Sequence, residues 1–509
     1  MISRRTLLGA TAATAATAGL VLAGPAVAAG RRRPSSTWDR LDNALAGDLV
    51  LPGDPGYDQA RQLENAQFDT VFPQAVVYAE NAADVRTAIR FAQDEGLPTA
   101  VRSGGHSYAG WSTSEGLVIN LTRLNKVAVK GGTVSLQPAV QAVDVPGQLA
   151  PRGLSVPAGF CATVSPGGFV SGGGTGWQYR KYGPACDRLV GAEVVLADGR
   201  IVNVSKDCHP DLLWALRGGG GGNFGVVTEF RMAPTQVGRV GHYTLTWDWA
   251  HAQQAVAGYL QWTTEASPDL SSDGVLLLPD ASPGAAPSFL VTGVDLAGID
   301  ALKQELAHLT ALIGVPPATQ VVQDLSYPDA LMQVFGCGSL TVDACHTTGA
   351  NPHASLPRQA YVKNRGRMFT RVLPADGIDR LLTAFDADRR AGQTRVVSLL
   401  GLGKNANNRS LDYGAWPHRD SLYSAIATVS LANWNPPAEE REAAQDWIDG
   451  VFDAFDPYSN GRSYLNFPDT RLTDYADAYW GPNLSRLSRV KRAYDPHDFF
   501  HYAQSVPLG

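Results

Sequence analysis

The sequence predicts an α+β fold with two domains, and three observations support that class. The chain has 509 residues, which is too long for one ordinary hydrophobic core. Hydrophobic residues make up 44% of it and charged residues 18%, a balance typical of globular rather than disordered proteins. Near residue 233, short strands separated by glycine-rich turns give way to longer β-like runs that alternate with amphipathic helices.

The first domain begins with a predicted strand–helix–strand unit. Val76–Tyr78 is a short apolar strand. Asn81 is placed to cap a helix with apolar residues at helical spacing, and Gly96 is placed to end it. Pro98–Arg102 is the next expected strand, which completes a βαβ unit.

Further elements are predicted on both sides of residue 233. In the first domain the expected strands span residues 116–121, 133–136, 189–196, 201–204 and 226–231. An Asp-Gly turn joins the third and fourth of these as a hairpin. In the second domain, strands are expected at 243–247 and 275–278 and helices at 298–313 and 439–455. The tail from residue 462 carries both strand and helix signals.

The N-terminus has the features of a twin-arginine export signal, so we expect a secreted protein. Ser3–Leu8 contains the paired arginines, an apolar stretch follows, and Ala26–Ala28 supplies a small-x-small cleavage site. Residues 1–28 are therefore predicted to be the signal. A membrane anchor is the alternative, but the apolar stretch is short and rich in Ala and Thr. After cleavage we expect no membrane association.

Charge and cysteine content narrow the possible partners. The formal net charge of -6 argues against a nucleic-acid partner, because proteins that bind nucleic acid need clustered Lys and Arg.

The cysteine count is odd. Five cysteines in an exported chain leave one thiol for another role. Cys337 and Cys345 could pair, but their spacing alone does not decide it. No His or Cys cluster has zinc spacing, so no metal is expected. The sequence does not specify an oligomeric state.

The strongest motif is the turn after the predicted strand at residues 98–102. It consists of Arg102, Ser103, Gly104, Gly105, His106, Ser107 and Tyr108. Its glycines let backbone N–H groups converge on phosphate oxygens. It is neither a G-x-G-x-x-G fingerprint nor a G-K-[ST] loop. A bare turn of this kind is structural about as often as functional, but His106 is a bulky titratable residue that such a turn does not need.

Two further glycine-rich segments follow along the chain. Residues 159–168 contain Cys161 and run on to a second glycine cluster that ends at Gly176. Taken alone, an inert buried cysteine is the more common situation. Residues 216–227 contain five consecutive glycines, typical of a linker, but a strand follows at once and favours a ligand contact.

Together these three segments resemble the berberine bridge enzyme-like family, within the group that has a vanillyl-alcohol-oxidase or PCMH-type FAD domain. The C-terminal residues 464–469, 479–483 and 490–500 extend the resemblance over nearly the whole chain after the signal. The resemblance implies a PCMH-type FAD-binding domain at 60–235. It also implies a substrate domain with an antiparallel sheet and helices at 236–460, and a segment at 461–509 that returns to the FAD domain.

The resemblance also implies that FAD is bound through two covalent bonds. His106 matches the histidine bonded to the flavin 8α-methyl, and Cys161 matches the cysteine bonded to flavin C6. Such bonds need an unprotonated imidazole and a thiolate. The other implied cofactor contacts are Arg102, Ser103, Gly104, Gly105, Ser107, Val164, Gly167, Gly168, Gly172, Gly176, Gly225, Val227 and Asn466.

The implied reaction is oxidation of an alcohol on a sugar or a secondary metabolite. Val164 resembles oxygen-reactive members, so O2 is the expected acceptor and H2O2 the product. A dehydrogenase with another acceptor and a non-catalytic flavin-binding protein are the alternatives. Thr175 and Phe467 stand where many members have tyrosines. Tyr108 is then the candidate base or a ring packed on the flavin, and Tyr464, Asp469 and His418 are weaker candidates.

Overall fold

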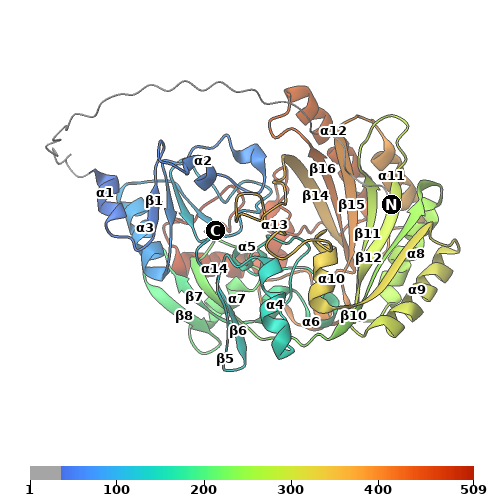
Figure 1. The fold of residues 1–509 in the computed structure, drawn as a ribbon, viewed down its shortest axis with the longest axis horizontal. Helices are drawn as coiled ribbons and strands as arrows, with labels where there is room; N and C mark the ends of the chain where they lie inside the picture. Colours follow the sequence, from blue (N-terminus) through green and yellow to red (C-terminus); the bar gives the residue numbers. More distant parts are fainter. Residues whose placement is uncertain (1–35) are drawn as a thin grey trace, which may run out of the picture. The chain divides into compact units, whose positions relative to one another are not determined.

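Three β-sheets organise the computed structural model, which describes residues 36–509 (Figure 1). The predicted signal, residues 1–28, lies outside the described residues. After the short helix α1 (Thr37–Asp42), residues 41–509 belong to one compact unit. The α+β class predicted from the sequence is confirmed. Among the described helices, none combines the length and apolarity that a membrane span requires.

The first sheet contains the predicted βαβ unit with one strand inserted. Its order is β1-β2-β4-β3, and β2 and β3 both run parallel to β4 between them. The helix begins as predicted, because the Asn81 side chain accepts hydrogen bonds from the backbone N–H groups of Ala83 and Asp84. The elements are β1 (Asp48–Val50), α2 (Tyr57–Ala60), β2 (Ala75–Tyr78), α3 (Ala82–Asp94), β3 (Thr99–Arg102) and β4 (Leu117–Asn120).

The second sheet is antiparallel and has the order β5-β6-β9-β7-β8. The predicted hairpin is confirmed, since β7 and β8 pair antiparallel around the Asp-Gly turn. Its strands are β5 (Val127–Lys130), β6 (Thr133–Leu136), β7 (Leu189–Val195), β8 (Ile201–Ser205) and β9 (Val226–Met232). Short helices lie between them: α4 (Pro146–Leu149), α5 (Pro166–Phe169), α6 (Tyr179–Tyr182) and α7 (Pro210–Leu216).

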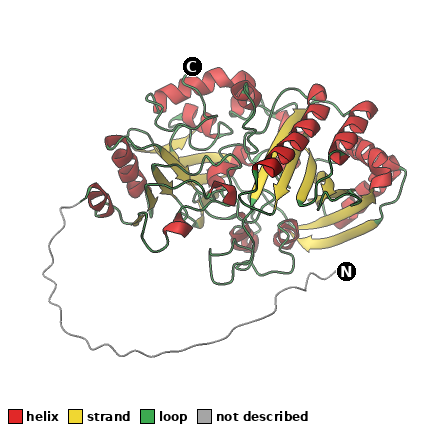
Figure 2. Ribbon diagram, turned by 90° about the horizontal axis from the view of Figure 1, so that it is seen from above, coloured by secondary structure: helices red, strands yellow, loops and turns green. Residues whose placement is uncertain are grey.

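The third sheet is a seven-stranded antiparallel layer in the order β13-β10-β12-β11-β15-β16-β14. Its strands are β10 (Arg239–Asp248), β11 (Leu270–Leu278), β12 (Ser288–Asp295), β13 (Thr319–Ser326), β14 (Tyr361–Phe369), β15 (Gln393–Gly401) and β16 (Tyr423–Leu431). Four helices cover one face of it (Figures 1 and 2): α8 (Ala252–Glu265), α9 (Ile299–Ile313), α11 (Ala375–Asp386) and α12 (Ala438–Phe455). Helix α10 (Tyr327–Val334) packs on the other face, where Tyr327 and Leu331 share a hydrophobic cluster with Val240 of β10 and Val294 of β12.

The C-terminal tail joins the core of the first half of the chain. Its helices are α13 (Tyr475–Trp480) and α14 (Leu484–Tyr494), and Trp480, Leu487 and Val506 pack in the same hydrophobic core as β7 and β9. The strand signal in the tail was misleading, because residues 462–509 form no strand. Residues 463–467 make turn and loop hydrogen bonds instead, such as Phe467 N–H to the Tyr464 carbonyl, and Tyr464 is buried in the core.

Candidate cofactor and active site

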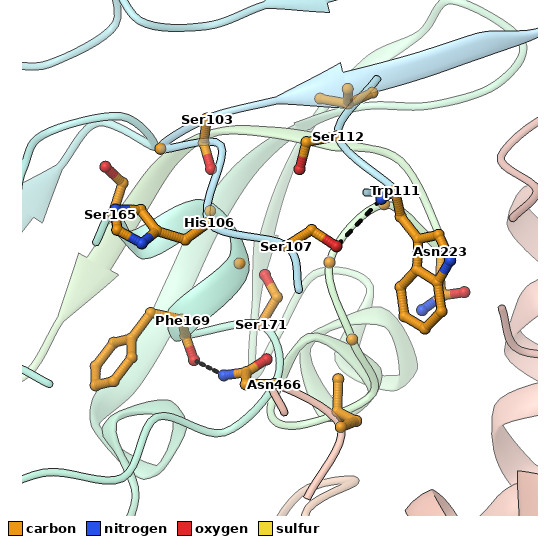
Figure 3. Close-up of a pocket in the computed structure, with 18 of the residues that line it drawn as sticks. Ser103, His106, Ser107, Trp111, Ser112, Ser165, Phe169, Ser171, Asn223 and Asn466 are labelled. Atoms are coloured by element: carbon orange, nitrogen blue, oxygen red, sulfur yellow. Dashed lines mark hydrogen bonds between the residues drawn. The ribbon is translucent and has the colours of Figure 1, made fainter. Parts of the chain in front are cut away.

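A cavity lies where the glycine-rich turns of the first half meet the tail (Figure 3). Most of the predicted site residues line it: Ser103, Gly104, Gly105, His106, Ser107, Tyr108, Cys161, Val164, Gly167, Gly168, Gly225, Val227 and Asn466. Its lining contains no Lys, Arg, Asp or Glu side chain. An anionic ligand in this cavity would therefore be bound chiefly by backbone N–H groups and hydroxyls.

The turn that follows β3 presents His106 to the cavity. Gly105 has a φ of 72°, a left-handed conformation that strongly favours glycine. The His106 Nε2 atom lies 2.9 Å from the Thr163 hydroxyl. Burial lowers the pKa of His106, although the Glu64 carboxylate and Thr163 act in the opposite sense. The imidazole is therefore neutral at neutral pH, the state in which it can form a bond.

Cys161 reaches the same cavity from a loop more than fifty residues further along the chain. Its thiol is accessible, but it lies deep among protein atoms. Burial, with a smaller contribution from the Glu64 carboxylate, raises the pKa of Cys161 to about 11. The protein surroundings alone thus favour the thiol over the thiolate.

Glu64 is a charged residue that sequence reasoning missed; it lies near the cavity without being part of its lining. Its carboxylate influences the pKa values of His106, Tyr108 and Cys161. Its backbone N–H donates to the Gly105 carbonyl at 3.2 Å, and the Thr347 hydroxyl donates to its carboxylate at 2.9 Å. No local motif surrounds it, and its position depends on contacts between segments far apart in sequence.

Three predicted contacts lie behind the cavity wall rather than on it. The Arg102 guanidinium donates to the carbonyls of residues 60, 61, 62 and 112, so it fixes the turn from behind. A Cβ on Gly172 would lie 1.9 Å from Asn466 Oδ1, and one on Gly176 would lie 1.9 Å from the Ala158 carbonyl oxygen. These two glycines permit close approach of chain segments.

The aromatic side of the cavity is built by Tyr108 and the tail. The Tyr108 and Phe467 rings stack with centroids 5.4 Å apart. Burial first, then the charges of Cys161 and Glu64, raise the pKa of Tyr108 well above its ordinary value. Tyr464 Oη accepts hydrogen bonds from the backbone N–H groups of Gly174 and Thr175 and from Asn466 Nδ2, which identifies a structural role.

The tail closes the opposite end of the cavity, which the sequence did not reveal. Phe500, His501 and Tyr502 line it, and the Tyr502 ring stacks on Trp111 at 4.6 Å. Asn223, after the glycine run, donates to Tyr502 Oη at 2.9 Å. The stacked pair offers a flat apolar wall made by Trp111, close to His106 in sequence, and by Tyr502 of the tail.

The remaining candidates are placed elsewhere. Asp469 binds Arg365, and His418 is buried beside Trp416, so neither lines the cavity.

A disulfide joins Cys337 and Cys345. Residues 36–509 contain no group of three or more His, Cys, Asp or Glu side chains arranged to hold a metal ion.

The cavity fits FAD in three respects. The turns at 103–107 and 220–225 bring backbone and hydroxyl groups to one wall, as a pyrophosphate requires. Aromatic and apolar side chains form walls suited to flat rings. His106 and Cys161, from separate loops, supply two nucleophiles on the same cavity.

Comparison with known proteins agrees with this geometry. Residues 73–205 match the family described as an FAD binding domain, and residues 463–507 match the family described as berberine and berberine like. This chain is 28% identical to YgaK, an uncharacterized FAD-linked oxidoreductase of Bacillus subtilis (strain 168). The match extends over 479 residues and covers 91% of this chain and 97% of YgaK.

Two further comparisons extend this result. The carbohydrate oxidase of Microdochium nivale is 26% identical to this chain over 488 residues. The match covers 91% of this chain and 93% of the oxidase. The solved structure of wild-type BBE-like 1 of Physcomitrella patens has a TM-score of 0.83 at 23% identity, over 93% of this chain and 99% of that one. The predicted fold, a PCMH-type FAD-binding domain combined with an antiparallel sheet and helices, is confirmed.

Proposed function

Because the chain belongs to the berberine bridge enzyme-like family of FAD-linked oxidoreductases, we propose that it is an oxidase of alcohols that holds its flavin by two covalent bonds. FAD held in this cavity would supply the redox chemistry, which is acceptance of a hydride from a substrate C–H bond and transfer of its electrons to O2. The observation that carries the covalent proposal is the convergence of His106 and Cys161 on one cavity.

The hydrogen bonding of His106 selects the nitrogen that forms the bond. Nε2 is engaged with the Thr163 hydroxyl at 2.9 Å. We therefore assign Nδ1 as the nucleophile, with Thr163 fixing the ring orientation. A substitution that removes this hydroxyl, Thr163→Val, should lower the yield of the His106 bond while leaving the Cys161 bond in place.

Intact-mass measurement of denatured protein tests the covalent proposal. The native chain should be heavier by one FAD. His106→Ala and Cys161→Ala should each keep the flavin through the other bond, and the double variant should release it. Cys208→Ala is the matched control, because Cys208 is an exposed cysteine away from the cavity. Release of all flavin from the denatured native chain would contradict the proposal.

The substrate class is an alcohol of a sugar or a secondary metabolite. The similarity to a carbohydrate oxidase supports a sugar. With its pKa raised, Tyr108 acts at neutral pH as a hydrogen-bond donor to the substrate oxygen rather than as a phenolate base. Anaerobic bleaching of the flavin by a panel of sugars and secondary-metabolite alcohols tests this class. A flavin that no alcohol bleaches would favour a non-catalytic binding protein.

Oxygen is the proposed electron acceptor. Val164, the residue that distinguishes oxygen-reactive members in the resemblance, lines the cavity. Substrate oxidation in air should form one H2O2 per turnover. A reduced flavin that reoxidises slowly in air and quickly with an artificial acceptor would identify a dehydrogenase instead.

Export through the twin-arginine pathway completes the proposal. It rests on Arg4, Arg5 and the cleavage pattern at Ala26–Ala28. Replacing both arginines by lysine should retain the protein inside the cell, whereas the native chain should be found outside with a new N-terminus after Ala28.

A further inference from the structure

A long connection between α10 and β14 runs against the half of the chain that contains the cofactor cavity. Residues 335–360, which we call the strap, are all described by the structure and form no helix or strand, only isolated bridges. The shape of such a segment depends on a few tertiary contacts, because it has no regular hydrogen bonding of its own. A disulfide between Cys337 and Cys345 closes its first part.

The disulfide lies directly behind the residue that follows Cys161. Cys337 and Cys345 are fully buried and form one small hydrophobic cluster with Val143 and Ala162. The Ala162 carbonyl also accepts a hydrogen bond from the Val143 N–H at 2.9 Å. The backbone next to the Cys161 thiol is therefore held by one hydrogen bond and by packing on the disulfide.

A polar contact fastens the same part of the strap. His346 follows Cys345, and its Nε2 atom lies 3.1 Å from the Asp144 carboxylate. Its Nδ1 atom lies 2.8 Å from the Val342 carbonyl oxygen, which fixes the ring from the strap side. The disulfide and His346 thus hold the same short segment, residues 142–144, that supports Ala162.

The other end of the strap is anchored elsewhere. The Arg358 guanidinium donates to the Leu63 carbonyl at 2.7 Å and binds both carboxylate oxygens of Asp69, at 2.6 and 2.9 Å. The segment between these two residues is hydrogen-bonded to the turn that carries His106. One end of the strap therefore supports the His106 turn, whereas the disulfide end supports the Cys161 loop.

Bond formation by Cys161 depends strongly on where its sulfur lies. Burial raises the pKa of Cys161 to about 11, so the surroundings do not favour the reactive thiolate. Misplacing a reacting group by about 1 Å slows a reaction by up to about a hundredfold. A thiol with little intrinsic activation cannot compensate for such a displacement.

We propose that the Cys337–Cys345 disulfide is a positioning element for the bond between Cys161 and the flavin. The inference rests on the proposed function, because it concerns one of the two proposed bonds. In that reaction the thiol S–H and the flavin C6–H are replaced by one S–C6 bond. The two hydrogens, with two electrons, pass through the flavin to O2, which becomes H2O2. Without the disulfide the strap separates from Ala162, and the Cys161 loop no longer holds the sulfur in place.

Intact mass of denatured protein in a His106→Ala background isolates the Cys161 bond. With the strap intact, the chains should carry one FAD. Adding Cys337→Ala and Cys345→Ala together should lower the fraction that carries it at least about fivefold, as expected for a misplaced nucleophile. In a Cys161→Ala background the same two changes should leave the His106 bond at full yield, which also shows that the variant folds.

Two further variants separate positioning from general damage. Asp144→Asn weakens the His346 contact without changing a cysteine, and it should lower the Cys161 yield part of the way. It tests the inference even where the cysteine variant fails to fold. Arg358→Gln is the matched control, because it loosens the other end of the same strap and should leave the Cys161 yield unchanged.

Hydrogen exchange gives a readout that needs no covalent flavin. The amides of residues 159–164 should exchange faster without the disulfide and at the native rate in Arg358→Gln. Full Cys161 yield without the disulfide, equal loss of both bonds, or unchanged exchange at residues 159–164 would overturn the inference. Absence of covalent flavin from the His106→Ala chain with its strap intact would count against the proposed double attachment instead, and the exchange rates would still decide the inference.

Discussion

Replacing Tyr464 by Phe separates a structural tyrosine from a catalytic one. In the native chain its oxygen accepts hydrogen bonds from Gly174 N–H at 2.9 Å, Thr175 N–H at 3.2 Å and Asn466 Nδ2 at 2.8 Å. Phenylalanine keeps the ring but leaves the two backbone donors buried and unpaired. Asn466 retains a second acceptor, the Phe169 carbonyl, at 3.2 Å.

The loss of stability expected for Tyr464→Phe follows from the number of backbone N–H groups left without an acceptor. Each buried backbone N–H without a partner costs about 1–2 kcal/mol, so Tyr464→Phe should lower the free energy of unfolding by roughly 2–4 kcal/mol. Chemical denaturation measures this, and hydrogen exchange at Gly174 and Thr175 should accelerate locally. Tyr182→Phe is the control, since it removes one exposed hydrogen bond and should cost less than about 0.5 kcal/mol.

Two results would refute this reasoning. One is a loss of stability below about 1 kcal/mol, which would mean that the two amides find other partners. The other is unchanged stability together with a fall of more than about a hundredfold in flavin reduction, which is the size expected of a proton-transfer residue. The pKa of Tyr464, raised by burial to about 12, agrees with the structural role.

Three further changes test other parts of the structure. Glu64→Gln should lower the pKa of Cys161 from about 11, so alkylation of flavin-free protein should become faster at pH 8; an unchanged rate would contradict the electrostatic link. Gly176→Ala should prevent flavin incorporation, seen as colourless protein, because its Cβ would lie 1.9 Å from a backbone oxygen. Asp187→Asn should cost about 3–5 kcal/mol in denaturation, because it leaves the buried Arg419 guanidinium without its bidentate partner; a loss below about 1 kcal/mol would count against this.

Local sequence signals predicted the parts of the fold that depend on short-range chemistry. Asn81 caps its helix and the Asp-Gly turn closes its hairpin, because capping and turn preferences act over a few residues. The predicted βαβ unit was also present, but sequence periodicity did not reveal that β4 lies between β2 and β3. Strand order depends on contacts between distant segments, which a local pattern does not encode.

In the candidate site, too, local motifs predicted some residues, whereas contacts between distant segments placed the others. The turn at 103–107 and Cys161 were found because glycine runs with an embedded His or Cys are unusual in sequence. Glu64 and Tyr502 were missed because each is an ordinary residue in an ordinary segment. Tertiary contacts bring Tyr502 into the cavity lining and Glu64 next to the turn that carries His106. Arg102 was expected at the cofactor, but its donors bind backbone carbonyls, an arrangement visible only once the chain is folded.

The charge distribution gives the proposed covalent attachment a physical reason. FAD carries a pyrophosphate, and most sites for such groups use Lys or Arg for part of the affinity. Among the described residues that line the cavity, none is a Lys or Arg. Backbone N–H groups and ring packing then supply the reversible binding, and bonds to His106 and Cys161 would make retention independent of it.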